Sequence, residues 1–128
     1  MPAYENQTIR YLLEHVAACY FHWLAYFALQ QPVGSINDEG FITVDLIRQL
    51  YRQVDDTVVA FLENFEGRMD VPVTGVHSSC GLVSATPVQL FTHVLTHEFH
   101  HKGQIMLMCR MLGYIPPDTD VSEFFKAG

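Results

Sequence analysis

Histidine is the unusual residue of this 128-residue sequence, because its seven copies equal all lysines and arginines together. His97 and His101 are four residues apart, so on a helix they lie on one face, a single turn from each other. Two imidazoles at this spacing can bind one divalent metal ion, with zinc–nitrogen distances of about 2.0–2.1 Å. Both interrupt an apolar stripe, where an unpaired buried imidazole would cost roughly 1–3 kcal/mol. We therefore predict that both are metal ligands.

Two other histidines of the same segment are less suited to this ion. His93 is on the same stripe but eight residues from His101, about 12 Å along a helix, so one ion cannot readily bind both. We expect it to line the surrounding pocket. His100 points about a third of a turn away from the pair, and we expect it at the rim of the site or in support of a ligand.

The third ligand must come from another helix, and His15 is the best candidate because its face is otherwise apolar. His22 follows seven residues later on the same side, but it lies two turns further along. Cys19 is four residues from His15 and could also ligate, although a small buried cysteine is ordinarily part of a core. Three protein ligands would leave an open position, which is the pattern of a catalytic metal site.

Helical periodicity predicts the elements that position these residues. We expect long helices at about 6–30, 43–66 and 86–112, and a final helical turn near 121–126. Residues 67–85 are the least regular part, although Val71, Val73 and Val76 allow a short extended piece there. With no repeat or linker in the sequence, we predict a single all-α domain over residues 1–128, a bundle of three long helices.

The third helix has the clearest boundaries. Thr86 can cap it, Pro87 suits its first turn, and Gln89 completes a Thr-x-x-Gln capping box. Gly113 supplies the C-terminal stop. Within this helix, Gly103 costs about 1 kcal/mol relative to alanine, so we expect another part of the chain to pack closely against it.

Composition excludes several classes of partner. The formal net charge is −7 with no basic run, so nucleic-acid binding is not expected. No apolar stretch approaches the length of a membrane span, which takes about 20 residues, and the N-terminus lacks the basic region of a signal peptide. The cysteines are odd in number and lack C-x-x-C spacing, which favours free thiols and a cytoplasmic location; they are Cys19, Cys80 and Cys109.

The string His97-Glu98-Phe99-His100-His101 matches the H-E-x-x-H pattern of zinc metallopeptidases, in which Glu98 would be the general base. The longer metallopeptidase patterns that extend H-E-x-x-H are not matched by the residues downstream. One form needs Gly and His where this chain has Gln104 and Leu107, and another needs a downstream glutamate, for which only Glu123 in the short tail is available. The small metallopeptidase therefore stays an alternative.

A longer pattern resembles the DinB/YfiT-like family. It comprises His97-x-x-x-His101-Lys-Gly-Gln104, an apolar helix to Leu112-Gly113, and then Pro116-Pro117-Asp118-x-Asp120. The segment Ile9 to Leu24 is similar to the early helix of that family, with His15 in the ligand place. The resemblance implies a four-helix bundle with a three-histidine site, His15, His97 and His101, for Zn²⁺ or Ni²⁺.

Characterised relatives of this family include metal-dependent transferases and isomerases that join a low-molecular-weight thiol to an electrophile. The resemblance thus implies an enzyme acting on a small-molecule substrate, either through an activated thiol or, as a hydrolase, through activated water. Gln104 could form a hydrogen bond across the bundle or with a residue that orients a metal ligand. A metal-binding or ligand-binding bundle without turnover is a further alternative, because it would use the same ligands.

The chain departs from this family at its start, since only fourteen residues precede His15 and the usual first helix is missing. A bundle with one helix fewer leaves an apolar groove, which a second copy could cover. We therefore expect a homodimer. The alternative is that residues 67–85 or 118–128 fold back over the gap.

Overall fold

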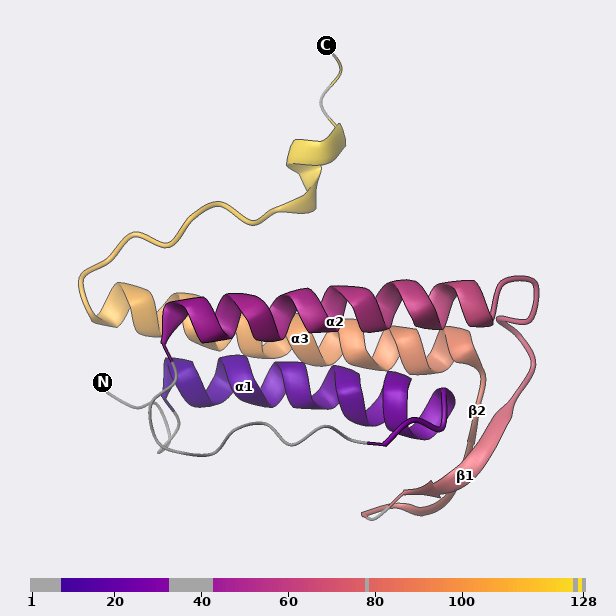
Figure 1. The fold of residues 1–128 in the computed structure, drawn as a ribbon. Coiled ribbons are helices and arrows are strands. Elements are labelled where there is room, and N and C mark those ends of the chain that lie inside the picture. Colours follow the sequence, from indigo (N-terminus) through magenta and orange to yellow (C-terminus); the bar gives the residue numbers. More distant parts are fainter. Residues whose placement is uncertain (1–7, 33–42, 78, 126, 128) are drawn as a thin grey trace.

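The computed structural model describes residues 8–32, 43–77, 79–125 and 127. Its described elements are listed in chain order: α1 (Ile9–Tyr20), the π-helix η1 (Phe21–Ala28), α2 (Val44–Asn64), β1 (Val73–His77), β2 (Gly81–Ala85), α3 (Pro87–Met111) and the 3-10 helix η2 (Val121–Phe125). The three long helices lie along one another, and α3 runs opposite to α1 (Figure 1). The predicted, mainly helical fold is confirmed.

The first helix begins at Thr8, whose side-chain oxygen accepts a hydrogen bond from the Tyr11 N–H. From Phe21 the chain continues as a π-helix to Ala28. The predicted first helix is thus present, but its last eight residues are π-helical and not α-helical. The predicted start at residue 6 lies outside the described residues. π-helical turns are rare and are often found beside functional sites.

Residues 67–85 are more regular than the sequence predicts, because β1 and β2 form an antiparallel hairpin from the pair Val73–Ala85 to the pair His77–Gly81. The positive φ of Gly81, +73°, suits the turn into β2. On β1, Gly75 lies so close to Phe27 that a Cβ atom would approach the ring to 3.1 Å. The hairpin therefore packs against η1.

The capping box predicted for α3 is confirmed. The Thr86 side chain accepts from the Gln89 N–H, and the Gln89 side chain accepts from the Thr86 N–H. The helix ends at Met111, and Gly113 follows with a φ of +89°. The expectation of close packing at Gly103 is wrong: a Cβ atom there would meet nothing within 4 Å, because this face of α3 is open.

A core of buried apolar side chains from all the long helices fixes how they pack. Among its fully buried members are Phe61 of α2, Leu12 and Leu24 of the first helical segment, and Val94 of α3. This core holds α1 between the other two helices. The side chains of α1 that face α3 outside the core are therefore held in fixed positions relative to those of α3.

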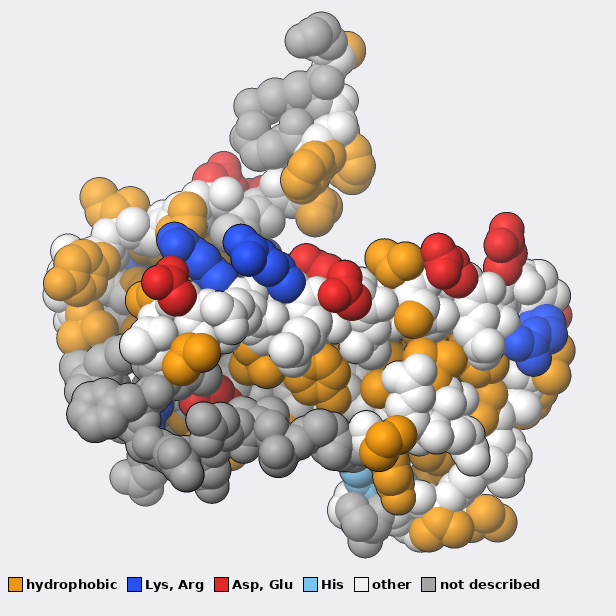
Figure 2. Space-filling model, in the orientation of Figure 1, with side chains coloured by type: hydrophobic (Ala, Val, Ile, Leu, Met, Phe, Trp, Pro, Cys, Tyr) orange, Lys and Arg blue, Asp and Glu red, His pale blue; other side chains and the backbone are white. Residues whose placement is uncertain are grey.

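The segment after α3 exposes apolar side chains, whereas the core buries them. It rises away from the bundle, and hydrophobic side chains gather on it (Figures 1 and 2). Phe124 and Phe125 of η2 are 88% and 77% exposed. The predicted final turn forms over Val121–Phe125, but these aromatic side chains remain uncovered.

Candidate metal centre

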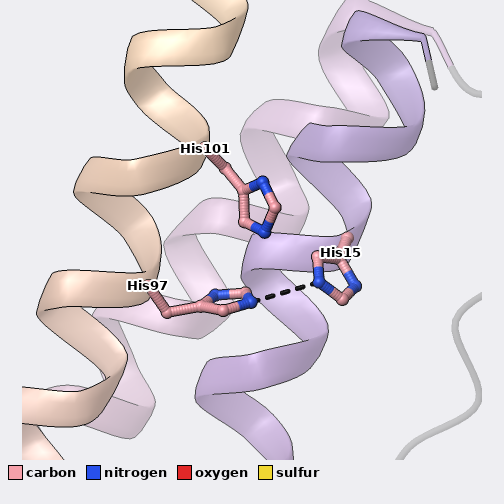
Figure 3. A group of neighbouring side chains, drawn as sticks. All are labelled: His15, His97 and His101. Atoms are coloured by element: carbon pink, nitrogen blue, oxygen red, sulfur yellow. Dashed lines mark hydrogen bonds between the residues drawn. The ribbon is translucent and has the colours of Figure 1, made fainter. Parts of the chain in front are cut away.

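Three histidines from two helices converge on one point. His15 of α1 faces His97 and His101 of α3, and one ring nitrogen from each lies within 4.8 Å of the other two (Figure 3). The Nε2 atoms of His15 and His97 are 3.1 Å apart. We call these residues the three-histidine cluster. The structure thus brings together the three residues that the sequence analysis selected.

The spacing suits a shared ion. Two nitrogens bound to one tetrahedral zinc ion are about 3.3 Å apart, given zinc–nitrogen distances of about 2.0–2.1 Å. The His15–His97 separation is close to this value. His101 completes a triangle, with its ring centroid 4.6 Å from that of His97 and 4.9 Å from that of His15.

The environment keeps the imidazoles of His15 and His97 neutral. Burial, followed by the neighbouring histidines, lowers the pKa of His97 from 6.5 to about 4. Burial and the proximity of His101 also lower the pKa of His15. A neutral imidazole has a free lone pair, which is the form that binds metals. Both residues are therefore in the ligating form at neutral pH.

Gln104 fixes the tautomer of the third histidine. Nδ1 of His101 lies 2.7 Å from Oε1 of Gln104, one turn further along α3. An amide oxygen can only accept a hydrogen bond, so the Nδ1 atom carries the proton and Nε2 keeps its lone pair. Metal-binding histidines commonly have this kind of support from a neighbouring acceptor. Gln104 thus lies where the sequence analysis expected a supporting residue.

One buried nitrogen of the cluster has no partner. Nδ1 of His97 is inaccessible to solvent and makes no hydrogen bond. A buried polar atom without a partner is costly, and the other ring nitrogen, Nε2, makes the hydrogen bond that joins this ring to His15 at 3.1 Å (Figure 3).

Glu98 points away from the cluster. It follows His97 by one residue, which is about 100° around a helix, and its carboxylate accepts a hydrogen bond from the Tyr20 hydroxyl. Burial and this carboxylate raise the pKa of Tyr20 above its usual range. Burial and Glu98 likewise raise the pKa of Tyr51. The glutamate of the H-E-x-x-H string therefore lies among phenols on another side of α3.

The alternative third ligands lie elsewhere. His22 contacts the rings of Trp23 and of His77 in the hairpin, the latter at 4.3 Å between centroids, and its buried Nε2 has no hydrogen-bond partner. Cys19 packs against the core, and burial raises the pKa of its thiol to about 11, which disfavours the ligating thiolate.

The remaining histidines border the cluster. His93 lies between Trp23, at 5.4 Å, and His97, at 6.2 Å between ring centroids. The exposed His100 touches His101 at 5.0 Å. Sequence reasoning missed His77, because only the hairpin brings it beside Trp23, where the two rings stack at 4.4 Å.

Comparison with known proteins agrees with this arrangement. The model of the DinB family matches residues 2–127. The chain belongs to the DinB family. It is also similar to Protein DinB of Bacillus subtilis (strain 168), with 27% identity over 77 residues, which are 60% of this chain and 44% of that protein. The match thus spans less than half the length of this curated relative.

Among the residues that the structure describes, no helix has the length and apolar character needed to cross a membrane.

Proposed function

We propose that this DinB-family protein is a metal-dependent enzyme in which His15, His97 and His101 hold one divalent ion, Zn²⁺ or Ni²⁺. The convergence of three imidazole nitrogens within 4.8 Å carries this proposal. Nitrogen ligands of this type suit both metals. Three protein ligands also leave a position open for a small molecule.

The chain's own residues prepare the site for that ion. Burial keeps His15 and His97 neutral, and Gln104 directs the His101 lone pair toward the other two rings. When bound, such an ion lowers the pKa of a thiol or a water molecule at the open position. His101 is buried, with 9% of its surface exposed, and electrostatic interactions are stronger where a group is removed from water.

We favour transfer of a low-molecular-weight thiol to a small-molecule electrophile. In this reaction the thiol loses its proton and its sulfur electron pair forms the new sulfur–carbon bond. The bond from that carbon to the leaving group breaks at the same time, and its electron pair departs with the leaving group, which takes up a proton. Hydrolysis by activated water uses the same residues. The two reactions are separated by a panel of thiols with a generic electrophile, assayed with and without a chelator. Product that forms only with added thiol and disappears with chelator supports transfer, whereas product without thiol supports hydrolysis.

The position of Glu98 argues against the metallopeptidase alternative. A general base must reach the water that it deprotonates. The Glu98 carboxylate instead accepts a hydrogen bond from the Tyr20 hydroxyl, and its residue lies about 100° around α3 from His97. A bundle that binds metal without turnover would take up the ion but fail to consume any thiol or electrophile of the panel.

We also propose that the protein works as a homodimer. The tail supports this, because Phe124, Phe125 and Ile115 expose 77–89% of their surface, and aromatic side chains in such positions are typical of an interface. Sedimentation velocity at low micromolar concentration tests the proposal. A species of twice 14.6 kDa is expected. A monomer that binds no dye for exposed apolar surface would contradict it.

A further inference from the structure

A pocket of about 220 Å³ opens on α3, away from the three-histidine cluster, and we call it the α3 pocket. Its walls are mostly apolar and include side chains of α1 and α3: Leu13, Val16, Ile105 and Met106. The charged residues of the lining, Glu98 and Lys102, have opposite signs, so apolar surface rather than charge selects an occupant. An apolar cavity of about 150 Å³ is large enough to bind benzene, so a phenyl ring fits in this pocket.

The helix η2 carries the most exposed aromatic side chains of the described part of the chain. They belong to Phe124 and Phe125, and Val121 beside them is also exposed. Figure 2 shows hydrophobic side chains gathered on this segment, which stands clear of the bundle (Figure 1). Apolar side chains grouped in this way are typical of a segment that packs against another surface.

The base of the tail is held at the rim of the α3 pocket. The Thr119 carbonyl oxygen accepts a hydrogen bond from the Lys102 ammonium group at 3.3 Å, and the Thr119 hydroxyl donates to the Met106 sulfur at 3.7 Å. The Asp120 N–H donates to the Asp118 side chain at 3.0 Å, a turn that aspartate commonly forms with its own backbone.

This turn directs the tail outward. Since η2 begins at Val121, directly after the turn, no free residue remains to reverse the chain toward the pocket of its own molecule. Figure 1 shows the result, because the segment rises away from the bundle. The tail of a second copy enters the pocket without disturbing the contacts of Thr119.

We propose that two copies of the chain exchange their tails, so that a phenylalanine of η2 from each copy fills the α3 pocket of the other. This rests on the proposed homodimer and specifies the surfaces that form it. An exchange of identical segments is reciprocal and closes on a two-fold axis, so neither pocket nor tail is left to recruit a third copy.

A native cysteine allows a direct test. Cys109 lines the α3 pocket and is a free thiol. Phe124→Cys and Phe125→Cys are made separately in the full-length chain, each with Cys80→Ser to remove the exposed native thiol, and are oxidised with diamide at low micromolar concentration. At least one of them should form a disulfide with the partner's Cys109, at least tenfold faster than the control.

A non-reducing gel should then show a covalent dimer, and peptide mass spectrometry should identify the linked pair. Val88→Cys in the same background is the matched control, because its position is exposed but lies 21 residues before Cys109, about 31 Å along α3. A bond to Cys109 within a single chain, seen as a linked pair in a monomer, would overturn the exchange. So would a dimer in which neither variant links to Cys109.

Sedimentation of a second variant measures the tail's share of dimerisation. Phe124→Ser combined with Phe125→Ser changes only exposed side chains, and it should raise the dissociation constant of the dimer by at least tenfold. An unchanged constant would overturn the exchange and leave the proposed homodimer standing. A wild-type protein that sediments as a monomer would overturn both.

Discussion

Two neighbouring sides of α3 carry opposite chemistry, although they begin at adjacent residues. His97 and His101 present ring nitrogens to His15, whereas Glu98 presents a carboxylate to Tyr20 and to a pocket with mostly apolar walls. On a helix, Glu98 lies about 100° around the axis from His97 and about 60° from His101. The difference shows that a string of adjacent residues does not make one site: helical geometry divides His97 and Glu98 between two environments.

The comparison also shows how each side is supported. Gln104 holds the tautomer of His101 on the metal-binding side. On the other side, the Tyr20 hydroxyl of α1 donates a hydrogen bond to Glu98. The Lys102 ammonium group, four residues further along α3, donates to the Thr119 carbonyl oxygen. If the two sides are independent, changes on the histidine side should affect metal binding strongly, and changes on the carboxylate side should affect it little.

The largest expected effect is loss of the metal. His101→Ala, His97→Ala or His15→Ala should each abolish stoichiometric binding of Zn²⁺ or Ni²⁺, because two imidazoles hold such an ion far more weakly than three. Metal analysis of the purified variants measures this. His22→Ala and His93→Ala should retain the metal, since these rings lie outside the three-histidine cluster. Stoichiometric metal in His101→Ala, or its loss in His22→Ala alone, would contradict the assignment.

A smaller effect is expected one turn further along α3. Gln104→Ala should weaken metal binding by about 10- to 100-fold, because His101 loses the acceptor that fixes its tautomer. Competition with a chromophoric chelator measures the affinity. Gln49→Ala, on an exposed part of α2, is the matched control and should bind like wild type. Equal affinities for both variants would show that His101 needs no such support.

The next effect is on the free energy of unfolding and comes from the lowered pKa of His97. The pKa of His97 is about 4 in the folded protein and 6.5 ordinarily, so between these values the unfolded chain binds a proton that the folded chain does not. With metal removed by chelation, the free energy of unfolding should therefore fall as the pH drops from 6.5 to 4. The expected loss is roughly 2 kcal/mol, less than the full shift implies because the ring is partly solvated.

Urea unfolding at several pH values measures this loss. His97→Gln should flatten the dependence in this window. His100→Gln, which removes only the smallest of the contributions to the pKa of His97, should change the dependence far less. An identical pH dependence in His97→Gln and wild type would show that other groups cause the acid sensitivity.

The sequence predicts those parts of the molecule that depend on local signals. Thr86 and Gln89 mark the start of α3, and the four-residue spacing of His97 and His101 places them on one face, because both follow from helical geometry. The hairpin was predicted only as a short extended piece, since Gly81–Ala85 has little strand pattern of its own and is ordered by pairing with β1.

Contacts between distant residues were harder to predict. The Tyr20–Glu98 bond joins residues 78 positions apart, and no local pattern signals it. His77 reaches Trp23 only because the hairpin folds onto η1. Gly103 illustrates the opposite error, because a glycine in a helix suggests close packing and the structure leaves that position open. His15 was selected as the third ligand from its otherwise apolar helical face, and the family resemblance implied the same residue.

The smallest expected effect sharpens the comparison most. Glu98→Gln should keep stoichiometric metal and lower any metal-dependent activity by no more than a few-fold, because the carboxylate is bonded to Tyr20 on the other side of α3. In a metallopeptidase the same change removes the general base and should cost several orders of magnitude while the metal stays bound. Activity and metal content measured on one preparation of the variant separate these outcomes. A loss of several orders with full metal content would mean that the two sides of α3 act as one site, and the independence inferred from their geometry would be wrong.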